Sequence, residues 1–459
     1  MIKVAIFFAF ILSGSFMHAQ DVTGEWNGVL NVFGTNLRIV FHINKTDDGY
    51  FSTMDSPDQG ATGIPVATTT FDGLKLSLAV ANIVYEGEFK TDSIAGTFKQ
   101  GGLNIPLTLK RTPAEIKPLV RPQEPIPPYP YISEEVTFDN EAAGVTLAGT
   151  LTMPATGKNF TAVILITGSG AQDRNEEIMG HKPFLVIADY LTRRGIAVLR
   201  YDDRGFAQST GDFASATTAD FATDVECAIR YLKTRKEINR RKIGLMGHSE
   251  GGIIAPMVAA RSKDVAFIVM LAGTGIRGAE LMLKQAELVH RTSGMSEDMI
   301  EKTIAVNAKV FDIILNSQET VSSQAITDFL TELKPEIAEI TPPGMTVNDY
   351  IRLFTSQVSG VWMQFLLRYD PSPALEKVKC PVLAVNGDKD VQVPAKENLT
   401  AISAALKKGG NKKVTIIEYP GLNHLFQECD TGSPVEYAII EQTFAPYVLK
   451  DLAEWIIKR

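Results

Sequence analysis

The chain has 459 residues, 45% of them hydrophobic and 21% charged, which is typical of a soluble globular protein with two or three domains. Its formal net charge of -8 argues against a nucleic-acid partner, because binding a polyanion requires a basic face. The three cysteines are an odd number and lack metal-ligand spacing. They exclude a full disulfide framework and favour free thiols, and we expect no metal site.

The first residues are typical of a secretory signal peptide. One lysine precedes a continuous apolar run from Val4 to Leu12, and small and polar residues follow. We therefore predict a signal peptide at residues 1–19, cleaved after Ala19, and a mature protein that is periplasmic or secreted. The apolar run is too short to span a bilayer, so we expect no stable membrane insertion after cleavage. An uncleaved anchor is the alternative.

Residues 20–112 have the pattern of a small antiparallel β-domain. Apolar and polar residues alternate over short stretches separated by glycine-containing turns, as at Leu37, Ile39, Phe41 and Ile43. A barrel and a sandwich both fit this pattern. The segment contains no grouping of serine, histidine and carboxylate residues, so we expect no catalytic role for it.

A proline-rich segment follows at residues 113–132. Seven prolines lie between Pro113 and Pro130, and they disfavour both helices and central strands. We predict a linker between two domains here.

From residue 133 to 459 strands alternate with helices, which predicts an α/β domain with a mostly parallel sheet. Continuous apolar runs, suited to strands covered by helices on both faces, occupy residues 162–166, 196–199, 243–246, 266–271, 382–385 and 414–417. Two earlier stretches, residues 135–138 and 145–151, predict an antiparallel edge. Helical periodicity replaces the strands at about residues 277–369, so we predict a helical cap or lid inserted there.

One motif in this domain points to a chemistry. An apolar strand leads directly into Gly247-His-Ser249-Glu-Gly251, and a small-residue apolar helix follows. G-x-S-x-G at a strand-to-helix turn is the nucleophile elbow of serine hydrolases, in which small residues let strand and helix approach closely. The bare pattern is weak, because a chain with 36 glycines contains such spacings by chance. The strand-turn-helix context favours Ser249 as a nucleophile.

Five motifs in order give residues 133–459 a resemblance to a known family. They are Thr167-Gly-Ser-Gly-Ala-Gln-Asp-Arg174, Tyr201-Asp-Asp-Arg-Gly205, Gly247-His-Ser-Glu-Gly-Gly252, Asn386-Gly-Asp-Lys-Asp-Val-Gln-Val-Pro394 and Gly421-Leu-Asn-His424. This part resembles the α/β-hydrolase superfamily, and within it secreted bacterial serine esterases with an N-terminal β-domain. The resemblance implies the α/β-hydrolase fold with a helical cap and covers about seven tenths of the chain.

Ser249 requires a base and an orienting carboxylate to act as a nucleophile. Among the six histidines, only His424 follows a late apolar strand in a short loop, which is where the resembled family keeps its base. Asp388 and Asp390 both follow the preceding strand and compete for the third position. The family pattern G-x-x-D-x-x-V-P selects Asp390. The order Ser249, Asp390, His424 is also that of α/β-hydrolases.

An acyl-transfer enzyme also needs donors for a tetrahedral oxyanion. We expect the backbone N–H of Glu250 to be one donor, because it follows the nucleophile. The second is expected from Ser169, in the loop after residues 162–166, with Gly170 as the alternative. A phosphate-binding role of this glycine-rich loop is less consistent with the sequence, which lacks G-x-G-x-x-G and the P-loop lysine here.

Other residues near these motifs receive weaker assignments. Asp202, Asp203 and Arg204 are interpreted as a salt-bridged turn shaping the floor of the site, and Asp173 with Arg174 in the same way. In the cap, Trp362 and Phe365 are candidates for lining a substrate pocket. Their spacing fits the core of a helix equally well.

The sequence thus predicts an exported carboxylic-ester hydrolase that forms an acyl-enzyme on short-chain esters without any cofactor. Two alternatives are a serine peptidase or amidase with the same triad and a non-catalytic carbohydrate- or surface-binding protein. The expected partner is a small-molecule ester, and a homo-oligomer is possible.

Overall fold

The computed structural model describes residues 21–459, apart from residues 33–34, 48, 60, 81–82, 101–102, 114–119 and 343–344. The expected signal peptide lies outside these residues. The chain forms two compact units, which divide between residues 116 and 117. In the described part, no helix is long and apolar enough to cross a membrane. The three cysteines are free thiols, of which Cys227 is buried.

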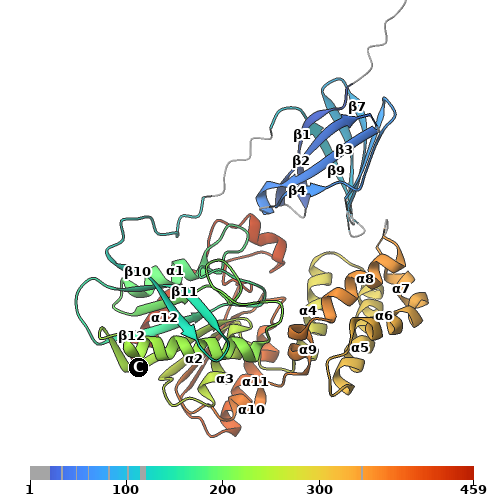
Figure 1. Cartoon of the computed structure of the whole chain (residues 1–459). Coiled ribbons are helices and arrows are strands. Elements are labelled where there is room, and N and C mark those ends of the chain that lie inside the picture. Colours follow the sequence, from blue (N-terminus) through green and yellow to red (C-terminus); the bar gives the residue numbers. More distant parts are fainter. Residues whose placement is uncertain are drawn as a thin grey trace, which may run out of the picture. The chain divides into compact units, whose positions relative to one another are not determined.

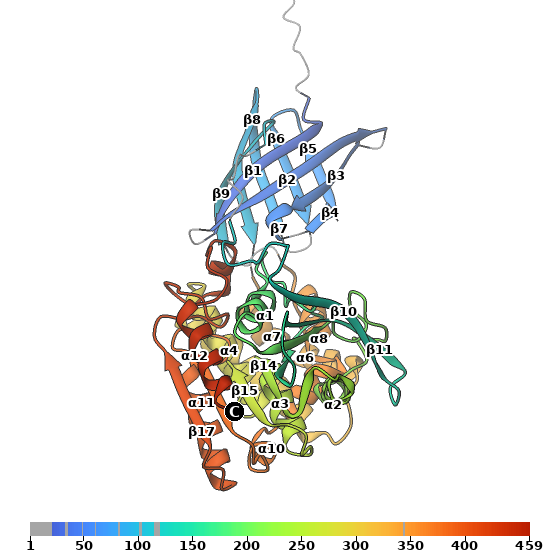
Figure 2. The same ribbon diagram turned by 90° about the vertical axis from the view of Figure 1, so that its left-hand side faces the viewer.

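The first unit is a single antiparallel sheet that curls around one apolar core (Figures 1 and 2). Its order is β4-β3-β2-β1-β9-β8-β7-β6-β5. The strands are β1 (Gly24–Val32), β2 (Thr35–Thr46), β3 (Gly49–Ser56), β4 (Ala61–Pro65), β5 (Thr68–Phe71), β6 (Lys75–Val80), β7 (Ile83–Lys90), β8 (Ser93–Gln100) and β9 (Leu103–Lys110). A short 3-10 helix, Pro57–Gln59, joins β3 to β4.

The alternation seen in the sequence explains this curled sheet. Ile39, Phe41 and Ile43 of β2 face the core, where Trp26 and Tyr85 are fully buried. The Tyr85 hydroxyl donates to the carbonyl of Ile94 at 2.9 Å, so its polar atom is satisfied inside the apolar interior. Of the two sequence alternatives, the structure has a half-barrel rather than a two-sheet sandwich.

The second unit contains an eight-stranded mixed sheet in the order β10-β11-β13-β12-β14-β15-β16-β17. Its strands are β10 (Tyr131–Asn140), β11 (Val145–Pro154), β12 (Phe160–Ile166), β13 (Ala197–Tyr201), β14 (Ile238–His248), β15 (Phe267–Leu271), β16 (Val382–Gly387) and β17 (Val414–Tyr419). β10 and β11 pair antiparallel at one edge, and β13 to β17 are parallel to β12. The predicted α/β fold with an antiparallel edge is therefore confirmed.

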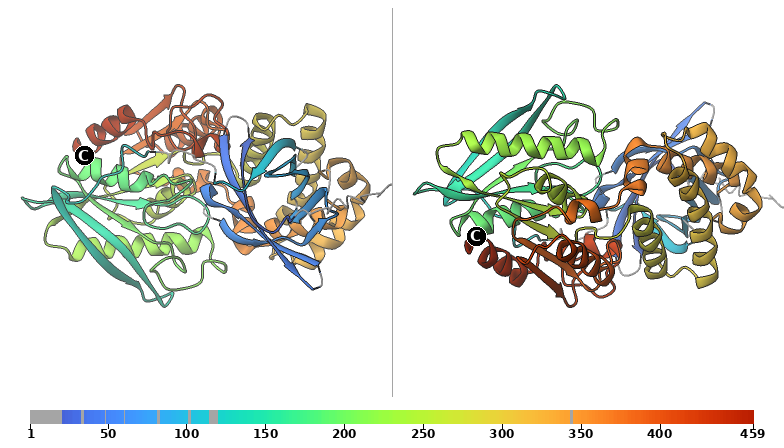
Figure 3. Two further views of the ribbon diagram at one scale, coloured as in Figure 1. Left: turned by 90° about the horizontal axis from the view of Figure 1, so that it is seen from above. Right: turned by 90° about the horizontal axis from the view of Figure 1, so that it is seen from below.

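Helices cover both faces of this sheet, as Figure 3 shows from two directions. One face packs against α2 (Thr218–Thr234), α3 (Gly251–Ala259), α10 (Ser372–Leu375) and α11 (Ala395–Lys408). The other packs against α1 (Pro183–Thr192) and α12 (Pro446–Ile457). Strands β12 and β15 are buried on both faces, which accounts for their continuous apolar runs. A second 3-10 helix, Pro434–Ala438, precedes α12.

The helical insertion lies between β15 and β16. It comprises α4 (Gly278–Thr292), α5 (Glu297–Asn316), α6 (Ser323–Glu332), α7 (Lys334–Ile340), α8 (Val347–Val358) and α9 (Val361–Arg368). These helices form a group of their own in Figure 1 and share an apolar core that includes Phe311, Ile314 and Leu330. The sequence prediction of a helical cap at this point of the fold is confirmed.

The second half of the proline-rich segment is attached to the α/β unit. The side chain of Gln123 accepts the N–H groups of Thr443 and Phe444 at 2.7 and 3.0 Å and donates to the Phe444 carbonyl at 2.6 Å. Arg121 donates to the carbonyl of Met179 at 2.9 Å. Residues from about 120 onward therefore belong structurally to the α/β unit, although the sequence indicates a linker throughout 113–132.

Candidate active site

Ser249 occupies a tight turn between β14 and α3. Its φ is +52°, a left-handed conformation that is unfavourable for a residue with a Cβ. The flanking glycines are required: a Cβ on Gly247 would lie 1.9 Å from the Gly251 carbonyl, and one on Gly251 would lie 2.2 Å from the Ile166 carbonyl. The Ser249 N–H donates to Leu271 of β15 at 2.9 Å. These contacts fix the turn at the end of β14 and leave Ser249 half-buried.

The structure brings His424 and Asp390 together. His424 follows β17, Asp390 follows β16, and both side chains are buried. Nδ1 of His424 lies 2.7 Å from Oδ2 of Asp390. The other carboxylate oxygen of Asp390 accepts the N–H groups of Gln392 and Val393, each at 2.8 Å. These hydrogen bonds hold the Asp390 side chain in place beside the imidazole of His424.

Asp388, the competing aspartate, has a different role. Its Oδ1 accepts the N–H of Gly421 at 2.7 Å and supports the loop that leads to His424. No contact between Asp388 and a histidine ring occurs in the described residues. Of the two aspartates, Asp390 is therefore the one within hydrogen-bond distance of the His424 ring.

The loop of His424 adjoins the nucleophile turn through His248. Nε2 of His248 lies 3.0 Å from the backbone carbonyl of His424, and the two imidazole rings are 4.7 Å apart between centroids. Because His248 immediately precedes Ser249, this contact joins the histidine loop to the elbow. The sequence pattern indicated no role for His248.

The expected oxyanion donors lie on either side of this turn. A Cβ placed on Gly168 would be 3.3 Å from Cβ of Ser249, so the loop after β12 passes beside Ser249. Within the described residues, the N–H groups of Glu250 and Ser169 have no acceptor. The N–H of Gly170, the alternative donor, also lacks one, and its φ of +94° marks a sharp turn. The N–H of Gly168 is engaged by Glu176 at 2.7 Å.

The carboxylate of Glu250 makes contacts that the sequence did not indicate. It is buried beside the nucleophile, where its Oε1 accepts from the Thr218 hydroxyl at 2.7 Å and from the Trp362 indole N–H at 2.8 Å. Burial raises the pKa of Glu250, and these two hydrogen bonds offset part of the rise. Trp362 belongs to α9, so the cap is hydrogen-bonded to the residue that follows Ser249.

The second pocket candidate lies in a different environment. Phe365 is half-buried and stacks on Tyr369, with ring centroids 5.7 Å apart. Of the two aromatic residues expected in the pocket, the structure brings Trp362 to the elbow. The contacts of Phe365 are those of a residue packed at the end of its own helix.

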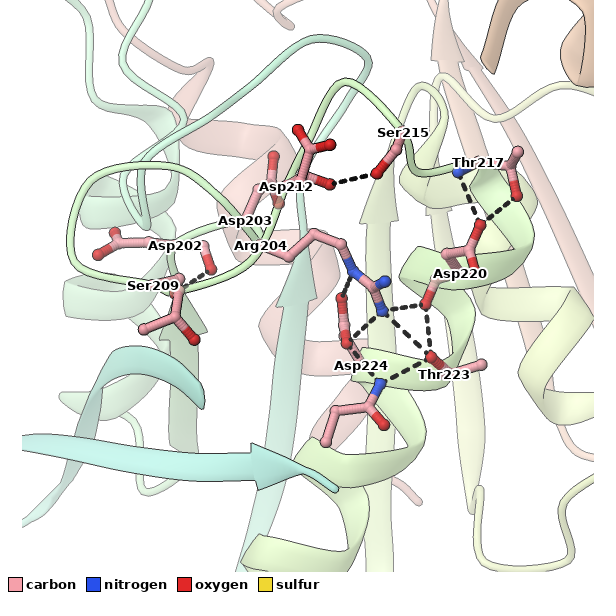
Figure 4. A network of polar contacts seen from close by, with 12 residues as sticks. Asp202, Asp203, Arg204, Ser209, Asp212, Ser215, Thr217, Asp220, Thr223 and Asp224 are labelled. Carbon is pink, nitrogen blue, oxygen red and sulfur yellow. Dashed lines mark hydrogen bonds and ion pairs between the residues drawn. The ribbon is translucent and has the colours of Figure 1, made fainter. Parts of the chain in front are cut away.

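The charged turn after β13 consists of buried ion pairs, as Figure 4 shows around Arg204. The guanidinium of Arg204 binds both oxygens of Asp224 at 2.7 Å each. Arg174 similarly binds Asp202, at 2.7 and 3.0 Å. Asp173 accepts the N–H groups of two residues in its own turn. These contacts agree with the interpretation of the turn as a framework for the site.

Asp203 differs from its neighbours, because it holds both ends of the loop beside the nucleophile. Its two oxygens accept from the Thr167 hydroxyl at 2.7 Å and from the Gln172 N–H at 2.9 Å. Burial raises the pKa of Asp203 well above its ordinary value; the two hydrogen bonds oppose this, and the nearby charges of Glu250 and Glu176 raise it further. Loop 167–172 is thus fixed by a carboxylate from the next strand.

The remaining histidines of the described chain have other surroundings. His42 pairs with Asp55 in the β-domain at 2.9 Å. His181 is fully buried between Thr443 and Tyr437, and burial lowers its pKa to about 4. Burial also lowers the pKa of His290 in the cap. No group of three or more His, Cys, Asp or Glu residues in this part of the chain is arranged to hold a metal ion.

Comparison with known proteins identifies relatives of this unit. The chain is similar to the esterase EstD of Thermotoga maritima, with 26% identity over 329 residues, which cover 72% of this chain and 69% of that protein. Solved structures with a similar fold include a Pyrococcus furiosus esterase, at 16% identity and a TM-score of 0.42 over 72% of this chain and 93% of that one. Another is Est1E of Butyrivibrio proteoclasticus with bound ferulic acid, at 18% identity and a TM-score of 0.41 over 70% and 98%.

The family described as serine aminopeptidase S33 matches residues 182–430. This match covers more than half of the chain and includes the elbow, the cap and the Asp390–His424 pair. The chain therefore belongs to the serine aminopeptidase S33 family of α/β hydrolases, within which it is esterase-like.

Proposed function

We propose that this protein is an exported serine carboxylic-ester hydrolase that forms an acyl-enzyme on short-chain acyl esters. The proposal depends on one observation: contacts connect the elbow of Ser249, the pair of His424 and Asp390, and the loop that carries His424. Ser249 lies on a strained elbow, His424 is oriented by Asp390 at 2.7 Å, and His248 ties the loop of His424 to that elbow. This arrangement supplies nucleophile, base and orienting acid.

In the proposed reaction, the Ser249 hydroxyl oxygen attacks the ester carbonyl carbon while Nε2 of His424 accepts the hydroxyl proton. The N–H groups of Glu250 and Ser169 would donate to the resulting oxyanion. Collapse of the intermediate breaks the carbon–oxygen bond to the alcohol, which leaves with the proton from His424. Water then attacks the acyl-enzyme, again losing its proton to His424, and the carboxylic acid is released as Ser249 regains its proton.

The cap supplies the proposed preference for short acyl chains. Trp362 is fixed at the elbow by its hydrogen bond to Glu250 and also packs against the core of the α/β unit. A large rigid side chain held beside the nucleophile limits the space for an acyl chain. Export is proposed from the N-terminal sequence pattern alone, and separation of cell fractions with detection of the mature N-terminus would test it.

The same triad can cleave amides, and the description of the matching family as serine aminopeptidases favours this as the second candidate. A matched pair of substrates separates the two functions: p-nitrophenyl acetate and p-nitroacetanilide, together with an aminoacyl p-nitroanilide. The proposal predicts turnover of the ester that far exceeds that of both anilides. Preferential cleavage of the aminoacyl anilide would replace the esterase assignment with a peptidase.

Replacing the nucleophile tests the catalytic claim against the non-catalytic alternative. Ser249→Ala should lower kcat by about 10⁴-fold or more, because the covalent step depends on this hydroxyl. The matched control is Ser215→Ala, since Ser215 is an exposed serine of the same unit. Ester turnover that is equal in the two variants would contradict the assignment of Ser249.

A further inference from the structure

Glu176 and His248 form a buried pair that the proposed reaction does not use. Nδ1 of His248 lies 2.9 Å from Oε1 of Glu176, and only 6% of His248 and 3% of Glu176 is exposed. Together they line a small cavity whose other walls are apolar, among them Phe184, Phe426 and Phe444. Each member of the pair therefore depends on the other for charge compensation on that side.

The hydrogen bonds determine which partner each ring nitrogen of His248 meets. A carbonyl oxygen only accepts, so Nε2 of His248 must donate to the backbone of His424 at 3.0 Å. Burial lowers the pKa of His248, but the charge and hydrogen bond of Glu176, the backbone of His424 and the charge of Asp390 together raise it above its ordinary value of 6.5. With Nε2 bonded to the backbone of His424, Nδ1 is the ring atom that meets Oε1 of Glu176.

The same oxygen of Glu176 reaches the loop beside the nucleophile. Oε1 accepts the N–H of Gly168 at 2.7 Å, immediately before Ser169, the expected oxyanion donor. Glu176 makes this contact from a buried position with a left-handed φ of +53°. Such a conformation is unfavourable for glutamate and persists only where surrounding contacts enforce it.

We propose that His248 and Glu176 are positioning residues, which set the oxyanion loop, the nucleophile elbow and the base relative to one another. The contacts form one continuous path from Gly168 through Glu176 and His248 to the backbone of His424. The side chain of His424 is fixed independently by Asp390. Asp390 thus holds the side chain of His424, and His248 holds its backbone. Through Glu176, His248 is also connected to the loop that carries the proposed oxyanion donor.

This inference rests on the proposed function, and the wild-type protein provides the reference that separates the two. If the wild type does not hydrolyse p-nitrophenyl acetate, the proposed function fails. If it does, variants of Glu176 test the positioning role. Glu176→Ala removes both hydrogen bonds and should lower kcat by about 10²-fold, the loss associated with a displacement of about 1 Å in reacting groups. KM should change little, because neither residue is placed against the substrate.

Two further variants separate positioning from a merely structural role. Glu176→Gln keeps an uncharged oxygen at the point where both contacts converge, so it can still accept the N–H of Gly168 and should lower kcat less than Glu176→Ala does. Glu176→Asp keeps the charge but withdraws the carboxylate by one carbon–carbon bond, about 1.5 Å. It should lower kcat by roughly tenfold or more with unchanged KM. If the alanine variant does not fold, Glu176→Asp provides the test of the positioning role.

The pair should also behave as one unit. His248→Ala is expected to lower kcat about as much as Glu176→Ala, and the double variant no more than either alone. Glu134→Gln is the control, because it removes the charge of Glu134, a residue of β10 that pairs with Arg235 after α2. Losses in kcat that multiply, or Glu176→Asp and Glu176→Ala variants with wild-type kcat and only a lower Tm, would overturn the proposal.

Discussion

Replacement of Asp390 by asparagine should move one proton on the His424 imidazole and leave the surrounding structure largely unchanged. In the wild type, Oδ1 of Asp390 accepts hydrogen bonds from the N–H groups of Gln392 and Val393 at 2.8 Å. The side-chain oxygen of the Asp390→Asn variant can still accept both. The new amide group takes the place of Oδ2, which lies 2.7 Å from Nδ1 of His424. An amide nitrogen donates, so Nδ1 must become the acceptor and the imidazole proton moves to Nε2. That tautomer cannot accept the proton of Ser249.

The expected loss follows from this change of tautomer. For the equivalent change in another serine hydrolase the loss is about 10⁴-fold in kcat, which corresponds to about 5 kcal/mol in the activation free energy. We expect a loss of the same order here, because the hydrogen-bond geometry of Asp390 is retained while its charge and acceptor are lost. The folded structure should be little affected, since each polar atom of the introduced amide keeps a partner.

The assay is kcat for p-nitrophenyl acetate at a pH where the wild type is fully active, with Tm measured on the same samples. Asp388→Asn is the matched control, because Asp388 follows the same strand and only supports the backbone of Gly421. Its kcat should remain close to that of the wild type. A larger loss for Asp388→Asn than for Asp390→Asn, or less than a tenfold loss for the latter, would refute the choice of acid.

Three other predictions concern the cap, the buried glutamate and the proline-rich segment. Trp362→Ala should shift the ratio of octanoate to acetate turnover upward by about tenfold or more, whereas Phe365→Ala should shift it less; equal ratios would exclude the cap as the selector. Glu250 has a raised pKa, so its contribution to stability is full below pH 4.5, its ordinary pKa, and is lost as pH rises through the folded-state value. Glu250→Gln should therefore flatten the decrease of Tm with rising pH in that window, and parallel Tm curves would contradict this. A fragment that begins at Val120 should have the kcat of the full chain. A fragment that begins at Pro130 should have the same kcat but a Tm several degrees lower, because it loses the three hydrogen bonds of Gln123, worth about 1 kcal/mol each. Equal Tm values for the two fragments would show that these bonds do not stabilise the α/β unit.

The sequence predicted those features whose causes are local. Gly247 and Gly251 lie two residues from Ser249, and their lack of a side chain is what the turn requires, so their spacing, together with the apolar strand before it and the small-residue helix after it, indicated the elbow. The apolar strands of the α/β sheet were equally visible, because burial on both faces leaves a continuous run in the sequence. The order of the motifs then placed the base and the acid on consecutive strands.

Features that depend on pairing between distant segments could not be predicted. The β-domain sequence fits a barrel and a sandwich alike, because the choice depends on pairing between β1 and β9, which lie far apart in the chain. Glu176 meets His248 across 72 residues, and Trp362 meets Glu250 across 112. Neither contact can be recognised in the sequence, because a single pair of buried polar residues produces no periodic pattern and no fixed spacing. The proline-rich segment shows the same limit, because composition alone does not reveal that Gln123 binds the backbone of Phe444.

Covalent labelling tests the central claim, that Ser249 is an activated nucleophile, more directly than any turnover measurement. The wild-type protein would be incubated with a fluorophosphonate, and the site of the adduct mapped by peptide mass spectrometry. We expect one adduct per chain, on the peptide that contains Ser249, and no adduct in either Ser249→Ala or His424→Ala. An adduct on another residue, or a protein that hydrolyses esters without forming any adduct at Ser249, would contradict it.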